Sequence, residues 1–366
     1  MGPVVRALAT ESASPPAAKM VKAIRVRELG GPEVLKWEDV EVGEPKEGEV
    51  RVKNKAIGLN FVDVYFRKGV YKAATVPYTP GVEACGVVTA VGPGLTGRQV
   101  GDLVAYAGQP MGSYAEEQIL PANRIVPVPP IDPTVAASLL LKGMTAQFLL
   151  RSCFKVEPGH TVLVHAAAAG VGSLLCQWAK ALGATVIGTV STKEKAAQAK
   201  EDGCHHVIIY KEEDFVARVK EITSDNGVEV IYDSVGKDTF EGSLACLKTR
   251  GYMVSFGQSS GAPDPVPLSA IAVKSLFLTR PRLFNYALDL NPKPKQLEIG
   301  FCQGFRSHSG KFNEDSMEED DLEDVSEPES EPESEDEEDV KLTEPSKKAI
   351  FNRDGLLDKL GDISWQ

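Results

Sequence analysis

The stretch from Thr161 to Lys193 constrains the fold of this chain more than any other. An apolar, β-branched run, Thr161 to Val164, predicts a buried strand of a parallel sheet. A turn of small residues follows, then a helix over Ser173 to Leu182 that ends at Gly183, and a second strand over Thr185 to Val190. Together these segments predict a βαβ crossover whose turn consists almost wholly of Ala and Gly.

Such a turn suits a dinucleotide, because small side chains let the backbone approach a pyrophosphate and the helix N-terminus favours its charge. The three positions of the usual G-x-G-x-x-G pattern are Ala167, Ala169 and Gly172 here, with Gly170 beside them. Within a complete βαβ unit this pattern favours dinucleotide binding. The alternative is a small-residue helix start that only packs against the sheet.

The end of the second strand indicates which dinucleotide binds. An NAD site has an Asp or Glu there, about 20 residues beyond the glycines, for the ribose 2′-hydroxyl. This chain instead has Gly188, Thr189, Ser191, Thr192 and Lys193, and no carboxylate before Glu194. Because a lysine with hydroxyl donors suits a 2′-phosphate, we expect NADP(H). In the alternative, Lys193 is only a solvated lysine at a helix start.

The 366 residues are enough for about two domains. Their charge is uneven, since residues 289–366 hold 23 acidic and 9 basic residues, whereas residues 1–288 hold 29 and 31. The net charge of −12 therefore belongs to the tail. We expect no nucleic-acid partner for the main body.

The six cysteines are scattered, with no two closer than 23 positions, which excludes a CxxC-type zinc site and favours reduced thiols in the cytosol. The apolar run Ser138 to Leu150 is too short to span a membrane and is interrupted at Lys142, so we expect no membrane association. Residues 1–19 are rich in Ala, Pro and Ser, and we expect a disordered leader before a natural start at Met20. Organelle import is the less favoured alternative.

The remaining pattern divides the chain. From Val21 to Leu120, short β-rich runs alternate with Gly/Pro turns, which predicts a β-rich domain, and Pro133 to Leu150 predicts a helix. Beyond the central unit, strands and helices alternate. The strands are expected over 205–210, 228–235, 251–257 and 275–281, and the helices over 212–223 and 239–247. Six strands in this order predict a doubly wound parallel sheet.

Beyond Tyr286 this pattern ends. Glu314 to Asp339 holds 17 acidic residues in 26 and no basic one, a composition that cannot fold alone. Ser316, Ser326, Ser330 and Ser334 each have Glu three positions later, the pattern that acidophilic kinases use. A solvated acidic linker without regulation is an equal alternative.

Five blocks of the chain occur in the order typical of one family: "AIGLNFVDVYFRKGVY", "LLLKGMTAQFLL", "HAAAAGVGSLLCQWAKALGATVIGTV", "VIYDSVGKDTF" and "VSFGQSSGAP". From about Val21 to Tyr286 the chain resembles the zinc-independent quinone oxidoreductases (zeta-crystallin-like) of the medium-chain dehydrogenase/reductase superfamily. The resemblance implies a GroES-like β-barrel substrate domain over 20–144 and a Rossmann domain over 145–286, together an α/β fold. It also implies a cytosolic enzyme, usually a homodimer, that transfers a hydride from NADPH to a small quinone or related enone.

The same resemblance implies site residues. The cleft beside the nicotinamide is implied to hold Asn60, Asp63, Tyr71 and Thr145. The implied cofactor-binding residues are Asn60, Thr145, Ala169, Gly170, Val171, Gly172, Gly188, Thr192, Lys193, Tyr210, Ser234, Phe256, Gly257, Leu278 and Arg280. Ala169 stands where the family commonly has Gly, and its methyl group could weaken cofactor binding.

No metal is expected. Zinc-dependent relatives need a Cys near the first cleft strand and a His in a "GHE" turn. The matching turn here is "PGVEACG", which puts Val82 at the His position, and no Cys lies near Asn60. Without a metal or a His or Cys nucleophile, catalysis would consist mostly of positioning the cofactor against the acceptor. We expect Tyr71 to form an aromatic cleft wall rather than to donate a proton.

The C-terminal segment Val340 to Gln366, "VKLTEPSKKAIFNRDGLLDKLGDISWQ", resembles the start of the core region of a eukaryotic nucleolar ribosomal-RNA-processing family. Residues 287–339 would link it to the body. The segment that completes the substrate domain in the family is then expected to be missing, which would expose apolar surface and indicates a truncated or fused gene product. Two alternatives to an enzyme follow: a non-catalytic NADPH-binding protein, and a nucleolar interaction protein acting through the tail.

Overall fold

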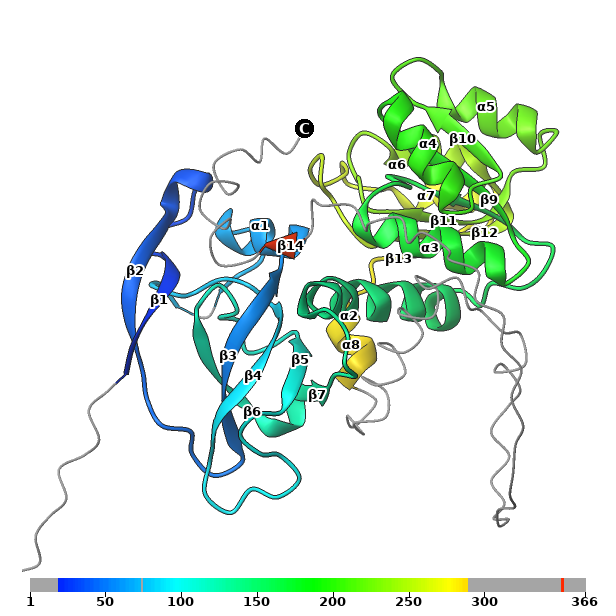
Figure 1. Cartoon of the computed structure of the whole chain (residues 1–366). Coiled ribbons are helices and arrows are strands. Elements are labelled where there is room, and N and C mark those ends of the chain that lie inside the picture. The colour runs from blue at the N-terminus through cyan, green and yellow to red at the C-terminus, as the bar shows by residue number, and fades with distance from the viewer. Residues whose placement is uncertain (1–18, 74, 289–349, 352–366) are drawn as a thin grey trace, which may run out of the picture.

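The computed structural model describes residues 19–73, 75–288 and 350–351, which form a β-rich body and an α/β body with a long helix between them (Figure 1). The predicted fold class is confirmed, because one body has an antiparallel GroES-like architecture and the other a parallel Rossmann-type sheet. Residues 1–18 of the predicted leader, the acidic segment with its four serines, and Cys302 lie outside the described residues, whereas Lys19 begins the first strand.

The β-rich body consists of two antiparallel sheets. Strand β1 (Lys19–Val26) pairs with β2 (Leu35–Val42) across a short 3-10 helix, η1 (Pro32–Val34). The larger sheet has the order β14-β3-β4-β5-β7, with β6 paired to β3. Its elements are β3 (Glu49–Gly58), α1 (Phe61–Arg67), β4 (Glu83–Val91), β5 (Leu103–Ala107), β6 (Glu117–Pro121), η2 (Ala122–Arg124), β7 (Ile125–Pro127) and β14 (Ile350–Phe351).

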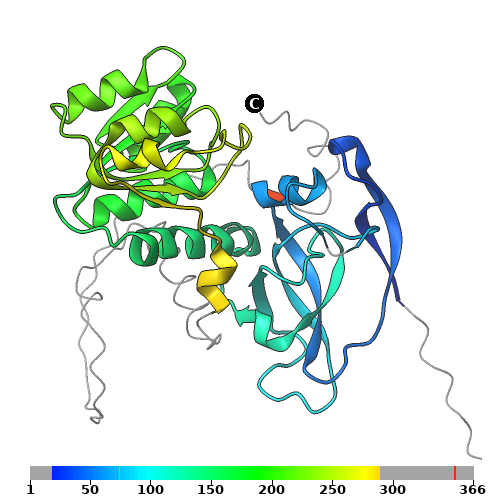
Figure 2. The same cartoon turned by 180° about the vertical axis from the view of Figure 1, so that it is seen from behind.

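The α/β body contains the six predicted strands in one parallel sheet of order β10-β9-β8-β11-β12-β13. Figure 2 shows this sheet with its helices from behind. Its elements are β8 (Thr161–Val164), α3 (Gly170–Ala181), β9 (Thr185–Val190), α4 (Lys193–Glu201), β10 (His206–Ile209), α5 (Phe215–Ile222), β11 (Val228–Asp233), α6 (Phe240–Cys246), β12 (Leu247–Ser255), α7 (Leu268–Ala272), β13 (Phe277–Thr279) and α8 (Leu283–Leu288).

The alternation of side chains along the strands produces two apolar cores, one on each face of this sheet. Val162 and Val164 of β8 pack with α3, where Trp178 is buried, whereas Leu163 between them packs with the opposite core. That opposite core includes Phe240 of α6. Successive residues of a strand point to opposite faces, so a parallel strand covered on both faces is apolar throughout.

Helices α1 and α7 were not predicted from sequence, and two further helices, α3 and α4, also differ from the prediction. Helix α3 begins at Gly170 instead of Ser173, so the residues expected in the turn form its first helical turn. Glycine has a low helix propensity, which is why the sequence indicates a later start. Helix α4 follows β9 directly and was not expected, because it is polar and buries only Ala199. An apolar periodicity is therefore absent from its sequence.

The long helix α2 (Pro133–Phe148) continues into a π-helical turn, η3 (Leu149–Cys153). Among the described residues it is the one helix that is long and apolar enough to cross a membrane by length and composition, contrary to our estimate from the shorter apolar run. However, 67% of its most apolar window is buried inside the protein. It supplies Leu149 and Leu150 to one body and Ala137 and Leu140 to the other, so burial explains its composition. The predicted domain boundary at 144/145 falls inside this helix.

Strand β14 was not expected. Ile350 and Phe351 pair antiparallel with Gly58 and Ile57 of β3, at the end of the substrate-domain sheet that leads into α1. A segment far along the chain therefore adds a short strand beside β3, and the expected loss of the segment that completes the substrate domain stays a prediction. The resemblance of residues 340–366 to the nucleolar family otherwise lies outside the described residues.

The start of α1 is held by two residues that were assigned to the cleft from sequence. Asn60 is the N-cap, and its backbone N–H donates to Asp63 Oδ2 at 3.0 Å. Tyr114 donates its hydroxyl proton to the same oxygen at 2.9 Å, whereas Asp63 Oδ1 has no hydrogen-bond partner. Burial is the main cause that raises the pKa of Asp63 to about 7, and the two hydrogen bonds oppose it.

This pKa predicts how Asp63 affects stability. The unfolded carboxyl titrates near pH ~4, so between about pH 4 and pH 7 the folded state binds more protons, and stability falls as the pH rises by up to ~1.4 kcal/mol per unit. Asp63→Asn keeps one oxygen for both hydrogen bonds and removes this titration. Denaturant unfolding of both proteins from pH 4 to 8 should therefore show the stability of the wild type falling relative to the variant. A difference in unfolding free energy that stays constant with pH would contradict the raised pKa. Asp264→Asn, at an exposed position, is the control.

Candidate functional site

The sequence-predicted cofactor residues of the α/β body lie in or after the parallel strands, toward the carboxyl edge of the sheet, whereas Asn60 precedes α1 and Thr145 lies in α2. Ala169, Gly170, Val171 and Gly172 follow β8; Gly188, Thr192 and Lys193 lie in or after β9; Tyr210 follows β10; Ser234 follows β11; Phe256 and Gly257 follow β12; and Leu278 and Arg280 lie in or after β13. Parallel strands present their carboxyl ends at one edge, where the crevices of such folds form.

The turn between β8 and α3 has the geometry of an anion site. Ala169 is the N-cap and has no side chain that could accept a hydrogen bond from the first helical turn. A Cβ on Gly172 would lie 2.2 Å from the Ala166 carbonyl oxygen, so this position requires glycine for the helix to approach the strand. The N–H groups of the first turn can therefore bind an external anion such as a pyrophosphate.

The methyl group of Ala169 does not strain this turn. Ala169 has φ −85° and ψ 167°, an extended conformation that any residue adopts. The residue with an unusual conformation is Ala166, with φ +54°, directly after β8 and His165. Non-glycine residues with positive φ are uncommon and often occur where backbone is shaped for a ligand.

Two of the predicted glycines are explained by packing. A Cβ on Gly188 would lie 2.6 Å from Cys204 Sγ and 2.7 Å from Ala167 Cβ. A Cβ on Gly257 would lie 2.6 Å from the Ser234 carbonyl oxygen. Both glycines thus allow neighbouring segments to approach the carboxyl edge closely. Packing alone therefore requires glycine at both positions, whether or not either glycine touches a ligand.

The ends of β9 and β10 form a basic corner. Thr192 is the N-cap of α4 and accepts the Lys195 N–H at 3.3 Å, and Lys193 is the first residue of the helix, with an exposed side chain. Tyr210, directly after the neighbouring strand β10, is 51% exposed. Lys195, which the sequence pattern did not indicate, adds a second ammonium group to this corner. Its Nζ donates to Ser191 Oγ at 3.2 Å. A helix N-terminus with two lysines favours a dianionic phosphate.

Arg280 is held within the protein. Its Nη1 donates to the carbonyl oxygens of Ser255 (2.7 Å) and Gly257 (2.8 Å), and its Nη2 donates to Gln258 Oε1 at 3.2 Å. The guanidinium therefore fixes the loop that follows β12. Leu278 lies within β13 and is 40% exposed.

The substrate-side residues come from α1, the loop after it, and α2. Tyr71 lies edge-on to Tyr65 (ring centroids 5.1 Å apart) and to Phe66 (5.8 Å), and the guanidinium of Arg282 lies 5.1 Å from its ring centroid. We call Tyr65, Phe66 and Tyr71 the aromatic wall; that it lines the cleft stays a prediction. Thr145 donates its hydroxyl proton to the Leu141 carbonyl oxygen at 2.8 Å, within α2.

Two sets of contacts beside this wall were not indicated by the sequence pattern, and the first joins the wall to the loop at the carboxyl edge. The Gln258 backbone N–H donates to the Tyr65 hydroxyl at 2.7 Å, across 193 positions of sequence. On the other side, Glu83 accepts from the side chains of Asn60 and Lys142. Asp63, by contrast, is 6% exposed and bonded to Asn60 and Tyr114, so it supports the start of α1, and its assignment to the cleft stays a prediction.

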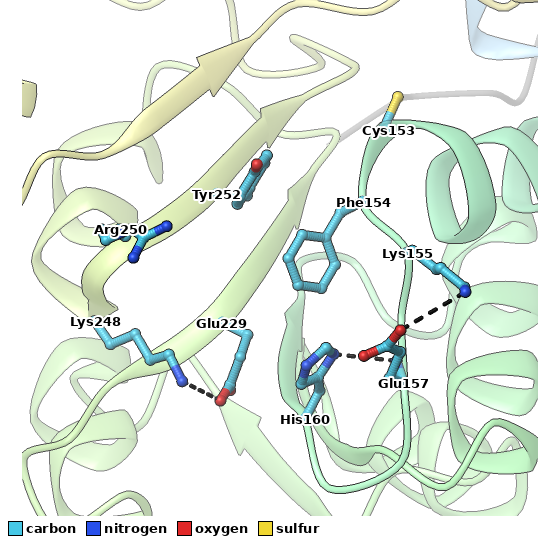
Figure 3. Close-up of a pocket in the computed structure, with 9 residues that line it drawn as sticks. All are labelled: Cys153, Phe154, Lys155, Glu157, His160, Glu229, Lys248, Arg250 and Tyr252. Atoms are coloured by element: carbon cyan, nitrogen blue, oxygen red, sulfur yellow. Dashed lines mark hydrogen bonds and ion pairs between the residues drawn. The ribbon is translucent and has the colours of Figure 1, made fainter.

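A cavity of about 390 Å³ lies at the opposite, amino edge of the sheet (Figure 3). It is lined by Cys153, Phe154, Lys155, Glu157, His160, Glu229, Lys248, Arg250 and Tyr252. Lys248 pairs with Glu229, and Lys155 lies 3.8 Å from Glu157, so most of its charges neutralise one another. Because the predicted cofactor residues lie at the other edge, the candidate site is the carboxyl edge of the sheet together with the residues of α1 and α2.

Comparison with known proteins identifies the family. Residues 46–130 match the alcohol dehydrogenase GroES-like domain, and residues 170–288 match the zinc-binding dehydrogenase domain. The chain is 48% identical over 275 residues to the 2-haloacrylate reductase of a Burkholderia species, covering 73% of this chain and 83% of that protein. It is also 48% identical over 270 residues to the quinone oxidoreductase of Pseudomonas aeruginosa, with the same coverage.

Comparison with solved structures leads to the same family. The structure of Escherichia coli quinone oxidoreductase complexed with NADPH matches with a TM-score of 0.75 and 44% identity, covering 79% of this chain and 89% of that one. Sequence, domain models and fold therefore lead to one conclusion: the chain belongs to the quinone oxidoreductase family of the medium-chain dehydrogenase/reductase superfamily and is an oxidoreductase.

Proposed function

We propose that this protein transfers a hydride from NADPH to a quinone or a related enone without using zinc. The observation that carries the proposal is the hydrogen bond between the Tyr65 hydroxyl and Gln258 N–H, at 2.7 Å. It joins the aromatic wall formed with Tyr71 to the loop after β12, beside the predicted cofactor residues. A flat acceptor placed against this wall would lie next to the cofactor edge.

The site fits NADPH in two respects. The open first turn of α3 suits the pyrophosphate, and the basic corner with Thr192, Lys193 and Tyr210 suits the 2′-phosphate. A relative of 44% identity has been solved in complex with NADPH, which supports the same cofactor here.

The position equivalent to a zinc ligand supports a reaction without metal. Val82 is 1% exposed and packs with Phe66 and Leu141, so an apolar cluster occupies the place where a zinc-dependent relative needs a histidine. Within the described ranges, no group of three or more His, Cys, Asp or Glu side chains could hold a metal ion.

NADPH, when bound, supplies the hydride. The protein then has to orient the acceptor and keep the reacting atoms close, which is worth several kcal/mol of a barrier (about 7–11 in favourable cases). The ring of Tyr71 and its neighbours provides a flat apolar surface for this purpose. Reduction of a quinone forms an aromatic ring that stabilises the new oxygen anion, so strong acid catalysis is not needed. A bound water can provide the proton, and Tyr71 is the less favoured donor.

Two classes of acceptor are to be distinguished: a quinone, which the proposal favours, and an activated alkene such as a haloacrylate. One relative of 48% identity is named a quinone oxidoreductase and another a 2-haloacrylate reductase. NADPH oxidation should be measured with 1,4-benzoquinone and with 2-chloroacrylate as acceptors. Faster oxidation with the quinone supports the proposal, and turnover of the acrylate alone would favour the activated alkene. NADPH binding without turnover of either would favour the non-catalytic alternative.

Lys193→Ala should discriminate between the two nicotinamide cofactors. Loss of a charge-assisted contact costs ~1.5–3 kcal/mol, so the dissociation constant for NADPH should rise roughly tenfold or more, while that for NADH stays nearly unchanged. Fluorescence titration of both cofactors measures this. Lys200→Ala, in the last turn of the same helix, is the matched control. Equal losses for NADPH and NADH would show that Lys193 does not bind the 2′-phosphate.

Metal removal should have no effect. Because Val82 and its apolar neighbours occupy the position of the zinc ligand, chelator treatment should change neither the unfolding midpoint nor the rate of NADPH oxidation. Elemental analysis should find less than stoichiometric zinc. One tightly held zinc ion per chain, removed together with activity, would refute zinc independence.

We also propose a cytosolic homodimer formed through the edge strand β13. Among the described strands, β13 ends the sheet, and it exposes Phe277 (46%) and Leu278 (40%). An exposed apolar edge strand is a template for pairing with a second chain.

Light scattering should therefore give the mass of two chains for the wild type, and Leu278→Lys should shift the protein toward the monomer, because a charged residue blocks edge pairing. Leu268→Lys, at an exposed apolar position (81%) outside the strand, should leave the mass unchanged. A dimer that persists in Leu278→Lys would place the interface elsewhere.

A further inference from the structure

Glu83, the first residue of β4, is completely buried and accepts hydrogen bonds from three donors. Its Oε1 accepts the Leu141 backbone N–H at 2.7 Å. Its Oε2 accepts the Asn60 side-chain Nδ2 at 2.8 Å and Lys142 Nζ at 3.3 Å. The Leu141 N–H and the Lys142 ammonium can only donate, one to each oxygen, and the ammonium supplies the charge that balances a carboxylate.

The carboxylate decides the orientation of Asn60. Only a donor can face a carboxylate oxygen, so the Asn60 amide must turn its nitrogen toward Glu83 and its oxygen away. A glutamine in place of Glu83 would have a single acceptor oxygen for Leu141 N–H and Asn60 Nδ2. One of these donors would then face the glutamine amide nitrogen.

Lys142 provides the balancing charge and a link to the cofactor side. The lysine lies in α2 and is 8% exposed. A Cβ on Gly170 would lie 2.9 Å from both Cδ and Cε of Lys142, so the lysine stem packs against the first residue of α3. One chain of contacts thus leads from Asn60 through Glu83 and Lys142 to the helix that follows the predicted pyrophosphate turn.

Buried ion pairs are weak evidence for stability, because well-packed apolar residues often replace them without loss. Here the pair lies between the cleft and the cofactor helix. We propose that Glu83 and Lys142 are positioning residues. They orient the Asn60 amide in the cleft and fix its position relative to the start of α3. The inference rests on the proposed function only for its effect on turnover, since the orientation of Asn60 can be measured without a substrate.

Lys142→Met removes the charge and keeps a stem that packs against Gly170. If the pair positions Asn60, kcat for a quinone should fall by about tenfold or more, as for a small misplacement near the reacting atoms, while NADPH affinity changes little. Lys142→Arg should restore most of the activity. Lys155→Met is the matched control, because Lys155 is exposed and lies at the opposite edge of the sheet.

A double-mutant cycle tests whether the pair acts through Asn60. In an Asn60→Ala background, Lys142→Met should cause no further loss of kcat, since the amide that it positions is gone. An equal loss of kcat in both backgrounds would indicate a merely structural role and would overturn the proposal.

The side-chain amide resonances of Asn60 provide a measurement that does not depend on turnover. They are assigned by their absence in Asn60→Ala and should shift in Lys142→Met but not in Lys155→Met. Should Lys142→Met fail to fold, Glu83→Gln/Lys142→Met contains neither buried charge and should shift the same resonances. Unchanged Asn60 resonances in a folded variant would overturn the positioning role. Shifted resonances in a protein that reduces no quinone would support it and refute only the proposed function.

Discussion

The burial of helix α2 between two sheets is the constraint on which the rest of the structure depends. Leu139, Leu149 and Leu150 of this continuous helical segment enter the core of the parallel sheet, whereas Ala137 and Leu140 enter the core of the β-rich body. Each buried leucine contributes roughly 1.5–3 kcal/mol relative to an exposed one. A helix that is apolar on all sides can contribute to both cores, and this double burial fixes the helix between the two bodies.

Small residues let the two sides of the cleft approach each other. Gly172 allows α3 to reach the Ala166 carbonyl, and Gly170 leaves room for the stem of Lys142. Through Lys142 the cofactor side contacts Glu83 and then Asn60, and through Gln258 it contacts Tyr65. The cleft is therefore connected at both flanks by polar contacts, which suits a reaction that depends on orientation more than on a reactive side chain.

Much of the cofactor side was predictable because it follows local periodicity. Strands β8 and β9 occur where their β-branched runs predict them, and the residues after them fall at one edge because the strands are parallel. Lys195 was missed because its exposed helix has no apolar repeat. Asp63 was assigned to the cleft by family resemblance, but spacing within α1 could not reveal that Tyr114 buries its carboxylate.

The sequence by itself determined the fold class, the order of the strands, the dinucleotide turn and the absence of an acid after β9, because each depends on residues close together along the chain. Only the tertiary structure decided which side chains face the cleft and which support it. Tyr65 meets Gln258, and Glu83 meets Lys142, across long separations in sequence. Such contacts arise from the packing of two bodies on α2, and no local pattern records them.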